Sequence, residues 1–220
     1  MYEVAARAGA DPVNFRLRYI EDPAPGKGLS TAAEYAKWAT RPSPKKAAAN
    51  GDIVTGRGIA LALPGGTHVA TVAEVEVNRH TGGVLLKKLT CAHDCGLIVN
   101  PGAQRGTVAA NLVQSTGRVL KEEVTFDRSN VTSTDSKSYP VARWSDIPEV
   151  EIVLLNHPET PSTGAGGPAA PRPPPSTTRF SMPRECGCAR PVDRRKGKSG
   201  AQSGRAEVVK LPRIIHKDLF

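Results

Sequence analysis

Apolar and polar residues alternate over much of the first 168 residues, and this period of two predicts β-strands. The clearest case is "HVATVAEVEV" followed by "GGVLLKKL", a hairpin whose turn is "RHTGG". The continuous apolar run "VEIVLL" predicts a buried strand. The predicted strands cover residues 56–63, 67–78, 84–93 and 150–156, with a further strand and turn over 122–133.

The N-terminal part of the chain has the spacing of short helices. Residues 1–20 offer Asp11 as an N-cap and Pro12 at the first helical position, a combination that favours helix initiation. The stretch "DPAPGKG" at 22–28 is rich in proline and glycine, so we expect it to break the chain. A short helix capped by Ser30 is predicted to follow.

A longer helix is predicted after the hairpin, where "NPGAQRGTVAANLVQSTGRVLKEE" returns to helical spacing. Asn100 is the expected N-cap, Pro101 the first helical residue, and Val108, Leu112 and Val119 fall close to one face. Strands and helices alternate irregularly along the chain. This predicts an α+β fold with mixed sheets and short helices, followed by a largely irregular tail.

The net charge of +9 is concentrated at the C-terminal end. Residues 169–220 contain twelve Lys and Arg against four Asp and Glu, which leaves +1 for the first 168 residues. We therefore divide the chain into a helical segment with a linker (1–55), an α+β domain (56–168) and a basic Pro/Arg-rich tail (169–220). The tail has no interleaved aromatic residues to stack on bases, so it could bind nucleic acid only through its positive charge. A solvated tail is therefore favoured over a nucleic-acid-binding one.

The sequence contains no stretch long and apolar enough to span a bilayer, and its first residues lack the pattern of a signal peptide. A cytoplasmic location is therefore expected for this chain. Its four cysteines are too few for a disulfide scaffold at this length.

The stretch "CAHDC" has the residue types of a metal site. Strand alternation places Cys91, His93 and Cys95 on one face, but neighbours two apart seldom converge on one tetrahedral ion. No second ligand pair follows at zinc-like spacing, so buried cysteines are favoured and no metal ligand is assigned. The pair Cys186 and Cys188 lacks the spacer of redox motifs and is taken as incidental.

The order D-C-G-x-x-x-N-P that begins at Asp94 predicts a strand-to-helix corner. Gly96 supplies flexibility, while Asn100 and Pro101 begin the helix. Such a corner is expected to expose backbone N–H groups, which suit an anion or a polar cofactor.

Taken together, "GRGIALALPGGTHVATVAEVEVNRHTGGVLLKKLTCAHDCGLIVNPGAQR", "LKEEVTFD" and "GAGGP" resemble the molybdopterin-binding large subunit of the xanthine dehydrogenase and aldehyde oxidase family. The similarity is strongest to the isoquinoline 1-oxidoreductase or aldehyde dehydrogenase type, and it covers the C-terminal part of such subunits, up to about Pro168. It implies hydroxylation of an aldehyde or N-heterocycle at a molybdenum–molybdopterin cofactor. The implied partners are an iron–sulfur subunit and the N-terminal portion of the large subunit, with a periplasmic location for some full-length relatives.

The resemblance also assigns residues near the cofactor. Gln114 matches the glutamine beside the pterin, and Gly164, Ala165 and Gly166 match the glycine turn that leads to the catalytic base. The corner residues that match are Asp94, Gly96, Asn100 and Pro101.

Two departures from the family pattern fall on the site. Where the family has a glutamate that takes the proton of the attacking hydroxyl or water, this chain has Gly167, which has no side chain to act as a base. Ala110 and Asn111 replace glycines that allow close approach to the cofactor. The chain is therefore expected to be inactive alone, as a fragment of a molybdenum hydroxylase or as a degenerate, non-catalytic product.

The tail after the glycine turn does not resemble the family in the given frame. Joining the third base of each codon to the first two of the next across "PPPSTTRFSMPRECGCAR" (173–190) allows "AAVNNAIFDATGVRVR", the family's next helix and strand. We infer a one-base shift in the coding sequence between about Gly167 and Pro173. An open run encoding that helix in the other frame of the DNA is the test.

Overall fold

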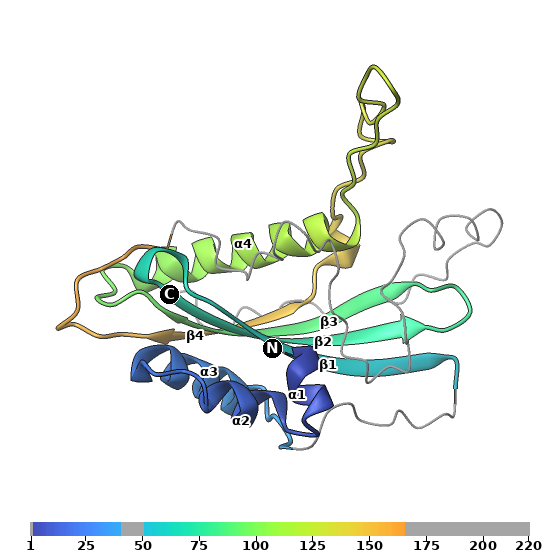
Figure 1. Ribbon diagram of the computed structural model, residues 1–220. Helices are drawn as coiled ribbons and strands as arrows, with labels where there is room; N and C mark the ends of the chain where they lie inside the picture. The colour runs from blue at the N-terminus through green and yellow to red at the C-terminus, as the bar shows by residue number, and fades with distance from the viewer. Residues whose placement is uncertain (1, 41–50, 166–220) are drawn as a thin grey trace.

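A computed structural model of the protein describes residues 2–40 and 51–165, in which one four-stranded sheet has helices on both faces (Figure 1). The strands are β1 (Ile53–Ala62), β2 (His68–Asn78), β3 (Val84–Asp94) and β4 (Glu149–Leu155), in the order β1-β2-β3-β4. The first two pairings are antiparallel and the third is parallel. The predicted α+β class with a mixed sheet is confirmed.

The β2–β3 hairpin has the predicted turn and contains a bulge. Glu74 pairs with Lys88 but the next residue, Val75, pairs with Leu86, so Lys87 is an extra residue on β3. A bulge shifts the inward and outward alternation by one position. Leu86 therefore lies with Leu89 in the same apolar cluster although the two are three residues apart.

Three helices cover one face of the sheet: α1 (Tyr2–Arg7), α2 (Pro12–Leu17) and α3 (Pro23–Tyr35). The predicted cap of α2 is confirmed, because the Asp11 carboxylate accepts the N–H groups of Val13 and Asn14, both at 3.0 Å. The same carboxylate accepts the indole N–H of Trp38 at 3.0 Å and so ties α2 to the end of α3.

The prediction of a break at 22–28 with a cap at Ser30 is wrong. Asp22 is the N-cap, and Pro23 and Pro25 lie in the first turn of α3, where a helix has no intrahelical use for the N–H groups that proline lacks. Ser30 lies inside the helix. At the other end, the Arg57 guanidinium contacts the carbonyl oxygens of Ala36 and Lys37.

The helix α4 (Pro101–Leu120) covers the opposite face and begins at the predicted cap, Asn100, which accepts the N–H of Ala103 at 3.0 Å. Each face of the sheet thus has its own core. The α3 side contains Val13, Leu29, Ala32, Ala33, Ala36, Ile59, Ala70, Val72 and Ala92. The α4 side contains Val69, Val75, Leu86, Leu89, Cys91, Val108 and Leu112.

The strand β4 lies at the outer edge of the sheet and is half-buried, which corrects the prediction of a buried strand. Its first residues are held to β3 by charge, since the Lys88 ammonium lies 2.9 Å from the Glu149 carboxylate and 3.0 Å from that of Glu151. These contacts, that with Glu149 foremost, raise the pKa of Lys88.

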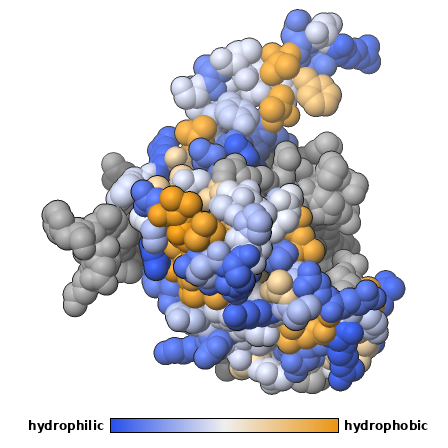
Figure 2. All heavy atoms as spheres, turned by 90° about the vertical axis from the view of Figure 1, so that its left-hand side faces the viewer, coloured by the Kyte–Doolittle hydropathy of each residue, from blue (hydrophilic) through white to orange (hydrophobic). Residues whose placement is uncertain are grey.

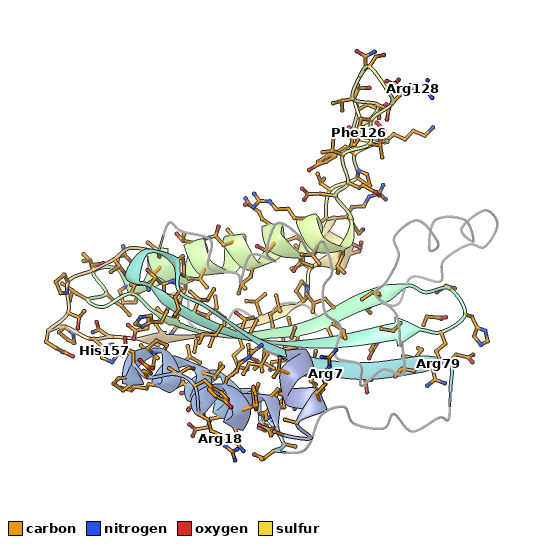
Figure 3. The ribbon with its side chains drawn as sticks, viewed as in Figure 1. Arg7, Arg18, Arg79, Phe126, Arg128 and His157 are labelled. Atoms are coloured by element: carbon orange, nitrogen blue, oxygen red, sulfur yellow. The ribbon has the colours of Figure 1, made fainter. Side chains whose placement is uncertain are left out.

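Residues 121–143 form an arm that projects from the far end of α4 (Figures 1 and 3). The strand and turn predicted there are reduced to one bridge between Phe126 and Val131, with Phe126 76% exposed. An ion pair joins Lys121, the first residue of the arm, to Asp146, which lies three residues beyond its end. Within residues 2–40 and 51–165, none of the helices has the length and apolar character needed to cross a membrane.

The two N-caps of this layer predict different losses of stability. Asp11→Ala removes a cap and leaves a half-buried indole N–H without its acceptor, so we expect a loss of about 2–4 kcal/mol in unfolding free energy and a shift in Trp38 fluorescence. Asp22→Ala, the matched control, removes one exposed cap bond and should cost about 1 kcal/mol. Equal losses in denaturant titrations would contradict the role of the Asp11–Trp38 bond.

Candidate functional site

Three connections meet at one end of the sheet (Figure 1). They are the turn between β1 and β2, which contains the short 3-10 helix Pro64–Gly66, the corner between β3 and α4 at 94–100, and the segment 156–165 after β4. They meet because parallel β3 and β4 end at the same edge of the sheet. This end is the candidate site.

Asp94 is the buried hydrogen-bonding centre of the corner. Its side chain is 5% exposed, and Oδ1 accepts the N–H of Gly96 at 3.1 Å and lies 3.1 Å from His157 Nδ1. Its Oδ2 is 3.8 Å from His68 Nδ1, on the first residue of β2. One carboxylate therefore contacts both the corner and the segment after β4, and lies close to β2.

Three of the corner's backbone N–H groups are already in use. The N–H of Leu97 donates to the Thr160 carbonyl at 2.9 Å, and that of Ile98 donates to the Asn156 side chain at 3.0 Å. With the N–H of Gly96 on Asp94, three donors of the corner bind the protein itself. For these three donors the expectation that the corner exposes N–H groups to an anion is wrong.

Gly96 allows the segment to lie directly against the corner. It has a positive φ of +78°, and a Cβ placed there would stand 2.5 Å from the Pro161 carbonyl oxygen and 2.9 Å from that of Thr160. On the other side Gly66, at φ +88°, has Thr163 Cγ2 3.2 Å from its own Cβ position. The segment thus passes between two glycine backbones.

Two threonines also hold the segment. We call the contacts of residues 160–164 with the backbones of Gly66, Cys95 and Gly96 and with Thr67 the clamp. The N–H of Thr163 donates to the Cys95 carbonyl at 2.9 Å, and its hydroxyl lies 2.8 Å from the hydroxyl of Thr67. The Thr67 hydroxyl also donates to the carbonyl of Gly164 at 3.2 Å. These contacts therefore fix the position of the chain immediately before the glycine turn at Gly164.

Gly164 differs from the two clamped glycines. Its φ is +82°, yet no described atom outside its immediate neighbours lies within 4 Å of a Cβ built on it. Among the described residues, its glycine is required by backbone conformation and not by a crowding neighbour. Within the part of the chain that the structure describes, no residue occupies the space where a side chain at this position would lie.

The sequence-based site residues separate into groups. The corner residues Asp94, Gly96, Asn100 and Pro101 lie at the same end as Gly164 and Ala165. Gln114 is on the exposed side of α4, fourteen residues after the cap and so roughly 20 Å further along the helix axis. Gly166, Gly167, Cys186, Cys188 and the tail lie outside the described residues.

The residues that hold the segment were not found from the sequence. Thr67, Thr163 and His157 carry no periodic signal, and their partners are sixty or more residues away along the chain. The one local hint was the position of the threonines beside "PGG" and "GAGG", where side chains near tight turns often bond to backbone.

The stretch "CAHDC" forms a buried polar contact with α4. Gln104 Nε2 lies 3.0 Å from His93 Nδ1 and donates to Cys95 Sγ at 3.1 Å, which confirms that His93 and Cys95 share a face. Cys91 and Cys95 are both buried, as expected. Desolvation lowers the pKa of His93 and so favours the neutral ring, and burial raises the pKa of the Cys91 thiol to about 11.

Apolar side chains also reach the surface at this end of the molecule (Figure 2). Leu63 is 56% exposed in the β1–β2 turn, and Leu97 and Val99 are 38% and 82% exposed in the corner. The clamped segment therefore lies among exposed apolar residues.

A model of the molybdopterin cofactor-binding domain matches residues 26–148, which is more than half of the chain. The chain belongs to this family. The match contains α4 and the whole β1–β3 meander, which together position the corner.

Subunits of longer proteins that are named as dehydrogenases or oxidoreductases contain regions similar in sequence to this chain. A nicotinate dehydrogenase subunit from Pseudomonas putida is 37% identical over 172 residues, covering 74% of this chain and 14% of the relative. The beta subunit of isoquinoline 1-oxidoreductase from Brevundimonas diminuta is 28% identical over 165 residues, covering 74% and 20%. The chain thus spans a fifth or less of these two relatives. Quinoline 2-oxidoreductase from Pseudomonas putida 86 matches 47% of this chain and 14% of its own, at 26% identity and a TM-score of 0.44.

The clamp predicts that two glycines with similar backbones respond differently to alanine. Gly96→Ala adds a Cβ against a carbonyl oxygen as well as left-handed strain, so we expect a loss of about 2–5 kcal/mol in unfolding free energy. Gly164→Ala, the control, meets only the left-handed penalty of about 1–2 kcal/mol. Thermal and denaturant unfolding give both values, and similar losses would contradict the close approach at Gly96.

The buried thiol predicts slow chemical modification. With a pKa of about 11, Cys91 is about 0.1% thiolate at pH 8, and burial further restricts access, so iodoacetamide should leave it unmodified until the protein unfolds. Ala110→Cys, on the exposed side of α4, should be modified within minutes under the same conditions. Peptide mass spectrometry measures both, and rapid labelling of Cys91 in the native protein would refute its burial.

Proposed function

We propose that residues 51–165 form one wall of a molybdopterin cofactor site, with the clamped segment presenting Gly164 and Ala165 toward the cofactor. Membership of the molybdopterin cofactor-binding domain family supports the choice of cofactor. The single observation that carries the proposal is that no atom of residues 2–40 or 51–165, its chain neighbours apart, lies within 4 Å of a Cβ built on Gly164, at the end of a segment that is otherwise held on both sides.

The described residues fit such a group in a limited way. The backbone at Gly164 leaves room for close approach among the described residues. The Gln114 amide, roughly 20 Å from the cap along the exposed side of α4, would offer a donor and an acceptor only to a part of the cofactor distant from Gly164. The donors of Gly96, Leu97 and Ile98 are used internally and would hold none of the cofactor. When bound, the molybdenum centre would supply the redox chemistry for transferring water-derived oxygen to an aldehyde or N-heterocycle.

We assign this chain a binding role without proton abstraction. Gly167 offers no group that could take a proton from a hydroxyl or water, so turnover by this chain is not expected. The remaining walls and the electron acceptor would come from further large-subunit protein and an iron–sulfur subunit. The tail after Gly167 remains, in our interpretation, the product of a one-base shift and has no role in the site.

Cofactor content and turnover test the two parts of this proposal separately. The chain is produced in a host that makes molybdopterin, alone and together with the rest of a nicotinate dehydrogenase-like large subunit and its iron–sulfur subunit. Molybdenum by mass spectrometry and pterin by fluorescence should be near zero for the chain alone and present in the assembly. Cofactor-free assemblies would contradict the binding role.

The base position predicts the turnover. In the assembly, nicotinate or isoquinoline oxidation should stay at background with Gly167 and rise by about 100-fold or more in Gly167→Glu, because a positioned general base contributes at least that much. Ser129→Glu, at the tip of the arm, adds a carboxylate far from the site and should change nothing. Cofactor-dependent turnover with Gly167 in place would rule out the missing base as the cause of inactivity.

A further inference from the structure

His157 occupies an unusual position at the start of the clamped segment. Its ring lies between two opposite charges, with Nδ1 3.1 Å from Asp94 Oδ1 at the end of β3 and Nε2 3.3 Å from the Lys27 ammonium on α3. Figure 3 shows it at the end of the sheet where the three connections meet. Its side chain is 23% exposed, less than a surface histidine such as His80, at 73%.

The two partners define which ring nitrogen carries the proton. A carboxylate only accepts hydrogen bonds and an ammonium only donates them. Nδ1 must therefore donate to Asp94, while Nε2 must accept from Lys27. The neutral ring in this one tautomer satisfies both neighbours at once.

The backbone of the same residue is also held. Its N–H donates to the Gly96 carbonyl at 3.1 Å, and its carbonyl accepts the N–H of Thr160 at 3.0 Å. His157 is thus tied to β3, α3 and the corner before the chain enters the passage between Gly66 and Gly96. Neither apolar core includes it.

We propose that His157 is a positioning residue, which acts through Asp94 and Lys27 to fix the direction in which residues 158–164 leave the sheet. A buried carboxylate needs donors, and without the imidazole Asp94 keeps, among residues 2–40 and 51–165, one backbone N–H and a histidine at 3.8 Å. Loss of His157 loosens the segment locally and leaves both cores intact. The consequence for the cofactor rests on the proposed function, whereas the anchoring itself does not.

Three substitutions of His157 separate the two ring contacts. Asparagine is the nearest mimic of the donor side, so His157→Asn retains a donor close to the Nδ1 position and loses the Lys27 contact. His157→Gln places its amide nearer to the Nε2 position and loses the Asp94 bond, and His157→Leu removes both. Lys27→Met removes the other contact from an exposed position and so keeps the test open if a His157 variant fails to fold.

Hydrogen exchange of the full chain measures the anchoring. His157→Leu should raise exchange of the Leu97, Thr160 and Thr163 amides by about 10-fold or more, with little change in the midpoint of unfolding, because it removes hydrogen bonds to charged groups at one point. His157→Asn should stay close to the parent protein, His157→Gln should resemble His157→Leu, and Lys27→Met should cause a smaller rise.

His80→Leu is the matched control, because it breaks an exposed histidine–aspartate contact of 2.7 Å with Asp52 at the opposite end of the sheet. It should leave the exchange of the segment unchanged. Unchanged exchange in His157→Leu, or a rise in His157→Asn as large as in His157→Leu, would overturn the proposal.

Molybdenum content of the assembly separates this inference from the proposed function. If the segment contacts the cofactor, His157→Leu should lower the molybdenum content and His157→Asn should restore it. Faster exchange with unchanged molybdenum content would support the anchoring by His157 and contradict the proposed cofactor wall.

Discussion

The close contact between the Gly96 backbone and the carbonyl oxygens of Thr160 and Pro161 determines the geometry of the candidate site. Without a side chain at this corner, the chain leaving β4 can lie against the chain leaving β3, and the backbone groups of both pair with each other. The other contacts of this segment depend on the short distance between these two chains. They include the threonine hydrogen bonds and the contacts of the His157 ring with Asp94 and Lys27.

The sheet makes this contact possible by its mixed topology. Three antiparallel strands form a meander, and the fourth returns parallel to β3 after a helix that crosses one face. Parallel neighbours end at the same edge, so the two chains that meet at Gly96 arrive side by side. The helices α3 and α4 bury the two faces separately, and the cores they form leave this edge to be organised by polar contacts.

The sequence predicted the parts of the fold that depend on local patterns. The hairpin followed from alternation, and α4 followed from Asn100, Pro101 and its helical spacing. The start of α3 was missed, because Pro23 and Pro25 signal a break in general but are harmless in a first helical turn. The clamp could not be predicted, since Thr67 and Thr163 are joined across ninety-six positions and most other ties are to backbone atoms. The corner was located correctly, but three of its N–H groups, those of Gly96, Leu97 and Ile98, bind the protein itself.

The buried contact of Gln104 with His93 and Cys95 has a consequence for the whole of α4. Apolar side chains alone tolerate a small rotation of a helix about its axis, whereas an amide held by a ring nitrogen and a sulfur has few alternatives. Gln104 therefore fixes the rotation of α4 about its own axis. Ten residues later, at about 100° per residue, that setting directs Gln114 about 80° away from the direction of Gln104. The buried side-chain amide of Gln104 thus determines which side chains of α4 point away from the sheet.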